Sequence, residues 1–159
     1  MSPSAKKRCW LVKSEPDVFS FDDLVSAKGR TTHWDGIRNF RARNSLREMK
    51  TGDTVLFYHS AAKEIVGVCE VAGEAKPDPT AFEKGHHGYD AKSKPDDPSW
   101  FMVDIRAVAR CEPPVTLAAI KADKRLANMT LVRIGRLTVS PVTPDEWDVI
   151  RNMTKLVPL

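Results

Sequence analysis

The chain has 159 residues, 42% of them hydrophobic and 29% charged, and its formal net charge is +4. This length supports one compact core but not two ordinary domains, and the composition excludes a largely disordered chain. The small basic excess permits binding to nucleic acid without proving it, and no stretch has the length and apolar character that would predict a membrane-spanning helix.

The first residues predict a tail followed by a buried strand. Residues 1–7 are expected to form a flexible N-terminal tail, and their lack of an apolar run argues against a secretion signal. The segment RCWLVKSEP, residues 8–16, predicts a strand that ends before Pro16, because proline cannot donate to a β-ladder. Ser20 is expected to cap a short helix whose first turn holds Asp22 and Asp23.

Residues 39–50 predict an amphipathic helix with a basic edge. Ala42, Leu46 and Met49 form an apolar stripe at helical spacing. A second stripe, about 100° round the helix, is basic and consists of Arg43, Arg47 and Lys50. Residues 38–50 contain five cations against one acid, a local excess typical of a phosphate-facing surface.

Residues 53–72 predict a β-hairpin. In DTVLFYHS, residues 53–60, the side chains alternate between two faces, so Phe57 and Tyr58 point to opposite sides. The segment AAKE is expected to connect this strand to the return strand IVGVCEVA, residues 65–72. Gly67 inside the return strand indicates a bulge or the close approach of another group.

The second half of the chain predicts a long loop followed by short elements. Residues 77–99 are rich in turn formers and are expected to form a long, partly mobile surface loop. Strands are expected at 100–111 and 136–142, and helices begin after Thr116 and Thr143, the latter with Glu146 in a capping box. Because the strands and helices do not alternate as βαβ units, the sequence predicts a single α+β domain at 8–156, built as a twisted, partly closed barrel.

Three segments in order along the chain carry a resemblance to a known family. They are WLVKSEP at 10–16, HWDGIRNFRARNSLREMKTGDTVLFYHS at 33–60, and IVGVCEV at 65–71. With WFMVDIRAV and SPVTPDEWDVI further on, they resemble the EVE domain family of the PUA-like superfamily over nearly the whole chain. The resemblance implies a PUA-like twisted pseudo-barrel of about five to seven mostly antiparallel strands flanked by short helices. It also implies a reader domain that takes a flipped, modified nucleobase of DNA or RNA into a pocket.

Such a reader needs an aromatic wall and polar groups that bond a base edge. The residues expected to form the base pocket are Trp34, Asn39, Tyr58, His59, Ser60, Ser14, Trp10 and Trp100. Trp34 is expected to be one wall and Tyr58 to help enclose the base, although a loop tryptophan can equally anchor the core and Trp10 has the setting of a core residue. Asn39 can bond a base edge or cap the helix, and one oxygen does not easily serve both roles.

Cations near the pocket are expected to hold the phosphates of the strand, with a solvated helix face as the alternative. The expected phosphate contacts are Arg38, Arg43, Arg41, Arg47 and Lys13. His86 and His87 are adjacent but lack the spacing and the further ligands of a metal site, so neither a metal nor another cofactor is expected.

Two other function classes remain open at this level. A thiol- or His-dependent enzyme acting on a nucleotide-like small molecule would need an activated side chain, but all three cysteines lie in hydrophobic runs, and the deaminase and dinucleotide motifs are missing. A peptide-binding interaction domain would bind with weaker salt dependence than a nucleic-acid reader.

The protein is therefore expected to be a non-catalytic reader whose partner is a nucleic acid carrying a modified base. It could act alone or beside a nuclease or another protein partner. The reduced thiols indicate the cytoplasm, or the nucleus if the source is eukaryotic.

Overall fold

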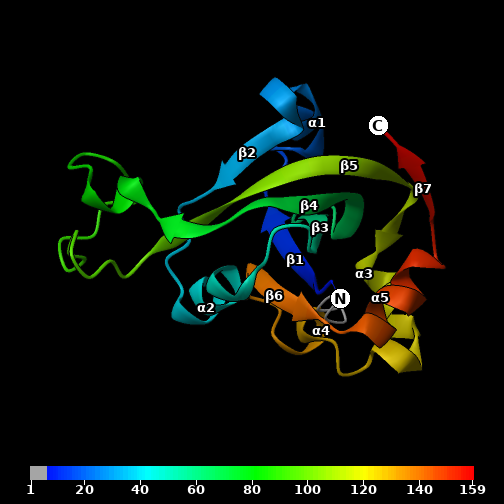
Figure 1. Cartoon of the computed structure of the whole chain (residues 1–159). Coiled ribbons are helices and arrows are strands. Elements are labelled where there is room, and N and C mark those ends of the chain that lie inside the picture. The colour runs from blue at the N-terminus through cyan, green and yellow to red at the C-terminus, as the bar shows by residue number, and fades with distance from the viewer. Residues whose placement is uncertain (1–6) are drawn as a thin grey trace, which may run out of the picture.

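The computed structural model describes residues 7–159, and within this range the chain forms one seven-stranded mixed sheet flanked by helices (Figure 1). The strands are β1 Cys9–Ser14, β2 Thr31–Trp34, β3 Thr54–His59, β4 Glu64–Pro77, β5 Phe101–Thr116, β6 Val139–Val142 and β7 Lys155–Pro158. The predicted α+β class and the expected number of strands are confirmed. The predicted flexible tail falls mostly on residues 1–6, which lie outside the described residues.

The sheet is mostly antiparallel and stays open. Its strand order is β2-β5-β4-β3-β1-β6, with β7 paired to a further part of β5, and only the β1–β3 pair is parallel among the described strands. Register shifts along β4 mark bulges, which bend a strand and increase its twist. The helix α2, Phe40–Glu48, contacts β6, β5 and β4 and so covers the gap between the two ends of the sheet. The result is the expected partly closed barrel.

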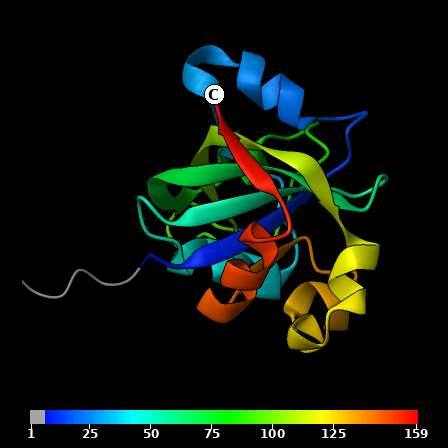
Figure 2. The same cartoon turned by 90° about the vertical axis from the view of Figure 1, so that its right-hand side faces the viewer.

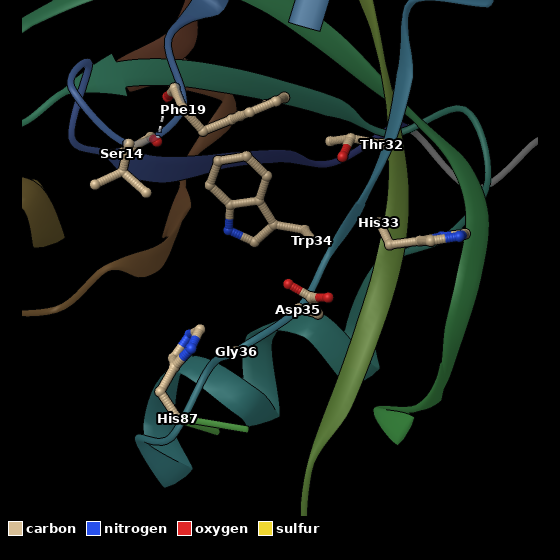
Figure 3. Close-up of a pocket in the computed structure, with 9 residues that line it drawn as sticks. Ser14, Phe19, Thr32, His33, Trp34, Asp35, Gly36 and His87 are labelled. Atoms are coloured by element: carbon tan, nitrogen blue, oxygen red, sulfur yellow. Dashed lines mark hydrogen bonds between the residues drawn. The ribbon is translucent and has the colours of Figure 1, made fainter. Parts of the chain in front are cut away.

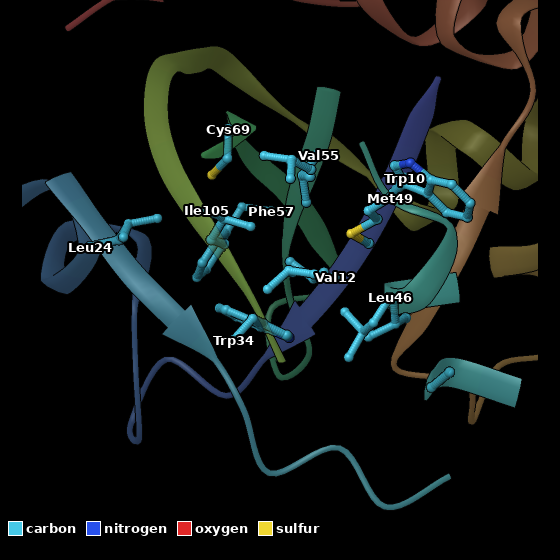
Figure 4. Packing of buried hydrophobic residues seen from close by; sticks show 14 of the residues in the cluster. Trp10, Val12, Leu24, Trp34, Leu46, Met49, Val55, Phe57, Cys69 and Ile105 are labelled. Carbon is cyan, nitrogen blue, oxygen red and sulfur yellow. The ribbon is translucent and has the colours of Figure 1, made fainter. Parts of the chain in front are cut away.

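Strand alternation produces two separate hydrophobic cores. Val12 and Phe57 face the inside of the barrel, where they pack with Trp34 and with Leu46 of α2 (Figure 4). Their neighbours Leu11, Leu56 and Tyr58 point to the opposite face, which is covered by the C-terminal helices (Figure 2). Residues next to each other on β1 and β3 therefore serve different sides of the sheet.

The helices begin where the sequence predicts caps. They are α1 Phe21–Ser26, α2 Phe40–Glu48, α3 Leu117–Ala122, α4 Thr130–Arg133 and α5 Pro144–Arg151, with 3₁₀ turns η1 Lys28–Arg30, η2 Pro79–Phe82 and η3 Lys124–Leu126. Ser20 forms a capping box with Asp23, and Thr143 forms one with Glu146. Thr116 caps α3 by accepting from the Ala119 N–H.

Gly67 is required by a close contact. A Cβ atom at this position would lie 2.3 Å from Cζ of Phe21, the first residue of α1. The aromatic ring occupies the place that any other side chain would need, and the β4–β5 register shifts beside the glycine. Both sequence-based reasons for a glycine inside a strand are confirmed.

The segment predicted as a long loop is built on extended strands. β4 continues to Pro77 and β5 begins at Phe101, so that the hairpin projects beyond the barrel (Figure 1). Between them the backbone N–H of Asp78 donates to the carbonyl of Trp100, and the Trp100 indole N–H donates to Asp90 at 2.7 Å. We call residues 78–100 the hairpin tip.

Candidate functional site

A cavity of about 450 Å³ opens beside the end of β1 and along β2, which places it at the mouth of the barrel (Figure 3). This volume is within the range of about 300–1,000 Å³ that is typical of small-molecule sites. It is lined by Ser14, Val18, Phe19, Thr32, His33, Trp34, Asp35, Gly36 and His87. We call it the first cavity.

Trp34 belongs to both the core and the cavity. Its side chain is 8% exposed and makes edge contacts with Phe57, at 5.5 Å between ring centroids, and with Phe19, at 6.4 Å. Figure 3 shows the indole between Ser14 and Phe19 on one side and Asp35 and His87 on the other. The two roles considered for this tryptophan, core anchor and cavity wall, therefore coexist.

Asp35 brings a carboxylate to the cavity. Burial against the walls raises its pKa, and the negative charge of the nearby Asp78 adds to the effect. Ser14 also lines the cavity, and its hydroxyl donates to the Phe19 carbonyl at 2.5 Å, which fixes the turn after β1. His33 points away in Figure 3 and pairs with Asp104 on β5. The first cavity thus combines an aromatic wall with an acceptor of raised pKa.

Arg38 holds the hairpin tip against the segment that lines the cavity. Its guanidinium donates to Asp78 at 3.0 Å, to Thr80 at 3.1 Å, and to the carbonyls of Gly88 and Ile37. A guanidinium has five N–H donors, and these contacts use all of them. The expected phosphate role does not fit this geometry, because a phosphate would have to displace an internal partner.

Asp78 completes this clamp from the other side. It is fully buried and accepts from the backbone N–H of Gly36 at 2.8 Å as well as from Arg38 and Thr80. Burial by itself would raise the pKa of Asp78, but the hydrogen bonds from Thr80, Gly36 and Arg38 outweigh it and lower the pKa. Because Gly36 lines the cavity, the clamp fixes the shape of the site.

Three further residues expected in the base pocket lie elsewhere. Trp10 is 1% exposed and donates its indole N–H to the buried Asp53 at 3.0 Å, so it is a core residue away from the cavity. Asn39 caps α2 by accepting from the Ala42 N–H, and its oxygen is therefore occupied. His59 accepts from the Phe21 N–H at 3.0 Å, and burial lowers its pKa.

Tyr58, Ser60 and Lys13 line a different cavity. It has a volume of about 250 Å³ and lies on the Tyr58 side of the sheet, since Tyr58 packs in the outer core and Trp34 in the inner one. Trp34 and Tyr58 cannot enclose one base, because Trp34 packs on Phe57, and the successive residues Phe57 and Tyr58 point to opposite faces of the sheet. The structure therefore separates a set of residues that the sequence-based prediction had grouped.

Trp100 lies at the base of the hairpin tip and stacks on Phe40. The ring centroids are 4.8 Å apart, and Phe40 at the start of α2 is 59% exposed. Arg43 lies over Phe40 at 4.8 Å and donates to the Ser99 carbonyl at 3.0 Å. Trp100 does not line the first cavity; it forms an aromatic platform with Phe40, which the sequence-based prediction did not include.

The remaining predicted cations lie along α2. Arg41 is exposed, and Arg47 is exposed with its guanidinium 4.7 Å from the ring of Phe101. Unlike Arg38, they are available to a ligand on the surface.

Several residues of the first cavity were missed by sequence reasoning. Phe19, Thr32, Asp35 and His87 come from the turn after β1, from β2, from the segment before α2 and from the hairpin tip. His87 was considered only as a metal ligand, and among residues 7–159 no group of three or more His, Cys, Asp and Glu residues could hold a metal ion. Asp35 lay inside the quoted HWDGIRN segment, where its raised pKa could not be read without its neighbours.

The cysteines do not form a nucleophilic site. Cys9, Cys69 and Cys111 are buried free thiols, and burial raises the pKa of all three, that of Cys111 to about 11. A thiol is reactive as a thiolate, which such a pKa disfavours at neutral pH. In the part of the chain that the structure describes, no helix is long and apolar enough to cross a membrane.

Comparison with protein families matches the EVE domain over residues 8–153. The chain belongs to the EVE domain family. Thymocyte nuclear protein 1 of Homo sapiens is 39% identical over 181 aligned residues, which cover 98% of this chain and 80% of that protein. The resemblance seen in the sequence is therefore confirmed.

Solved structures of EVE relatives share the fold. Human THYN1 protein, in complex with 5-methylcytosine containing DNA, is 40% identical with a TM-score of 0.88, over 92% of this chain and 97% of that chain. A hypothetical protein from Leishmania major is 43% identical with a TM-score of 0.85, over 92% and 94% of the two chains. The ZmASCH protein of Zymomonas mobilis, at 10% identity and a TM-score of 0.54, shares the fold alone.

Proposed function

We propose that this EVE domain is a non-catalytic, DNA-binding reader that holds a flipped 5-methylcytosine in the first cavity. The observation that carries the proposal is the cavity itself, in which Trp34 and Asp35 combine an aromatic wall with a carboxylate acceptor. It is supported by a solved relative of high similarity that is bound to DNA containing 5-methylcytosine.

The chemistry of the base fits the groups present. A cytosine offers an exocyclic amine, and Asp or Glu accept from that amine in protein–DNA complexes. Asp35 is the carboxylate that lines the cavity, and Phe19 and Val18 provide apolar surface for a methyl group. A flipped base also gains about 1–3 kcal/mol from stacking on an aromatic side chain. Trp34 is the side chain that we assign to this contact.

The strand outside the cavity would lie against the start of α2. Phe40 is exposed and supported from behind by Trp100, so that it can contact the base next to the flipped nucleotide. Arg41, Arg43 and Arg47 follow on the same helix and supply positive charge for phosphates. Arg38 is excluded from this role because its donors are used inside the protein.

Other aspects of the prediction stay open to test. Binding to RNA, a nuclease or other protein partner and a cytoplasmic location are predictions, and the name of the relatives, thymocyte nuclear protein, supports a nuclear location as the alternative. The absence of an activated thiol supports a reader over a thiol-dependent enzyme.

The test is a titration of DNA strands that differ only in one methyl group on one cytosine. The natural chain is expected to bind the methylated strand more tightly than the unmethylated one. Asp35→Asn is expected to weaken binding of both strands about tenfold, because it removes a charged hydrogen-bond acceptor from the lining of the cavity. Trp34→Leu tests the wall, with unfolding monitored because that residue is buried.

Asp145→Asn, on α5, removes the same charge away from the cavity and is the matched control. The proposal fails if the natural chain binds both strands equally and Asp35→Asn behaves like this control.

A further inference from the structure

The cavity on the outer face of the sheet, which we call the second cavity, has a strongly cationic lining. Lys13, Lys63 and Arg136 contribute to it, and no Asp or Glu is among its described lining residues. A neighbouring hollow of about 380 Å³ shares Lys63 and adds Lys121, again without a described acidic residue. A group of like charges without a counter-charge is suited to an anion.

Tyr58 and Lys13 form the floor of the second cavity. Tyr58 is 3% exposed, and its side chain lines this cavity. Lys13 lies 5.6 Å from the centroid of its ring and donates to the Gly135 carbonyl at 2.6 Å. An ammonium group has three donors, so Lys13 keeps further donors for a ligand. Burial lowers the pKa of Lys13, an effect that a bound anion would offset.

The walls of the second cavity are fixed in position. Lys63 has a backbone φ of 55°, which is uncommon for a residue other than glycine. Its N–H donates to the His59 carbonyl and its own carbonyl accepts from Leu117, both at 2.8 Å, so the turn is held on two sides. Strain that the surroundings maintain is typical of functional sites.

The two cavities lie on opposite faces of the sheet beside the end of strand β1. Lys13 lines the second cavity and Ser14 lines the first, and adjacent residues of a strand lie about 3.8 Å apart and point to opposite faces. A strand that leaves the first cavity over this end of β1 comes within reach of the cations on the other side.

We propose that the second cavity binds a phosphate group of the DNA strand whose flipped nucleotide occupies the first cavity. This proposal rests on the proposed reader function for the identity of the strand, but the phosphate site itself stands on its own geometry. Lys13, Lys63 and Arg136 would neutralise the phosphate, and the Tyr58 hydroxyl would donate to one of its oxygens. Tyr58, Ser60 and Lys13 thus recognise the backbone of the strand instead of the base.

The test replaces single phosphates by neutral methylphosphonates along a strand that carries one 5-methylcytosine. With the natural chain, one substitution beside the modified base is expected to weaken binding about tenfold, as for loss of a charged hydrogen bond. In the Lys13→Gln/Arg136→Gln variant the affinity is lower throughout, and the same substitution no longer has an effect. Lys155→Gln on β7, which removes one exposed charge away from both cavities, should keep the effect.

The same titrations also measure the preference for the methylated strand, which depends on the first cavity. The reader function and the phosphate site can therefore be contradicted independently of each other. The double variant is expected to keep that preference. Suppose that the natural chain prefers the methylated strand but that no methylphosphonate position affects binding. This result overturns the proposed phosphate site in the second cavity and leaves the proposed reader function in place.

A second measurement separates a strand phosphate from a free one. Inorganic phosphate is titrated into the isolated protein while the ring signals of Tyr58 are followed by NMR. Saturable shifts that Lys13→Gln abolishes, together with a methylphosphonate effect, support the proposal. If the shifts occur but no methylphosphonate position matters, the second cavity binds free phosphate and not the strand, and the proposal is overturned. If neither the shifts nor a methylphosphonate effect is seen, the second cavity is not a phosphate site.

Discussion

At the scale of single residues, the structure assigns Arg38 a different role from the one that its chemistry predicts. Arg38 has the guanidinium that suits a phosphate, but its five donors are used on Asp78, Thr80, Gly88 and Ile37. Gly88 is part of the same arrangement, since a Cβ there would lie 2.9 Å from the Arg38 guanidinium. A side chain of the right chemistry is a binding group only when the fold leaves its donors unused.

Asp35 leads to a prediction at this scale. Burial, with a smaller contribution from Asp78, raises its pKa, while His33 and His86 act in the opposite direction. The ionised carboxylate is a stronger acceptor for a cytosine amine than the protonated carboxyl group, so affinity is expected to fall as the pH is lowered through this raised pKa. The fall should therefore begin at a higher pH than for an ordinary aspartate, whose pKa is about 3.9.

The measurement is the dissociation constant of the methylated strand between about pH 4 and pH 7, a range that begins near the ordinary aspartate pKa and extends above it. Asp35→Asn, titrated with the same DNA, accounts for protonation of the cytosine itself. Identical pH profiles for the two proteins would show that Asp35 does not contact the base.

At the scale of elements, a glycine on β4 and an aromatic residue on α1 determine how the first helix rests on the barrel. Gly67→Ala is expected to lower the free energy of unfolding by about 1–3 kcal/mol, because the new methyl group would overlap the Phe21 ring. Urea unfolding measures this loss. In a Phe21→Leu background, which lacks the ring atoms concerned, the loss from Gly67→Ala should be smaller.

Gly73 provides the matched control on the same strand. A Cβ there would approach Asp104 at 3.5 Å, an ordinary contact, so Gly73→Ala should change the stability little. Equal losses at the two glycines would mean that backbone effects of the strand, and not the Phe21 contact, explain the need for Gly67.

At the scale of the whole molecule, the positive charge is distributed over both faces of one sheet. The α2 cations lie on the helix that follows the Trp34–Gly36 segment of the first cavity, and Lys13, Lys63 and Arg136 line the second. A net charge of only +4 can therefore serve a nucleic-acid partner, because local groups of cations, such as the one at the second cavity, attract phosphates more than the net charge indicates.

This distribution predicts the salt dependence of binding. A plot of log affinity against log salt concentration has a slope of roughly −0.9 for each phosphate neutralised on B-DNA. Arg41→Gln, at an exposed α2 position, should make that slope shallower by about one unit and weaken binding to all sequences similarly. Arg151→Gln on α5 loses the same charge and should leave the slope unchanged. A slope that Arg41→Gln does not alter would remove α2 from the interface.

The sequence by itself determined the local features and the family of this protein. The caps at Ser20, Thr116 and Thr143, the alternation along β3 and the period of α2 depend on residues within a few positions of each other, and the motifs at 10–16, 33–60 and 65–71 identified the EVE family. These signals do not depend on where distant segments lie, so they could be read from the chain directly.

Only the tertiary structure decided which residues share a cavity. Phe19, Asp35 and His87 come together because β2 pairs with β5 and the Arg38–Asp78 clamp holds the hairpin tip beside them. Tyr58 does not line the first cavity, contrary to the sequence-based prediction. On the paired strands β1 and β3, Lys13 and Tyr58 lie on the face opposite to Trp34. Alternation predicts that two faces exist, but the packing of distant elements decides which face closes around a core and which opens to a ligand.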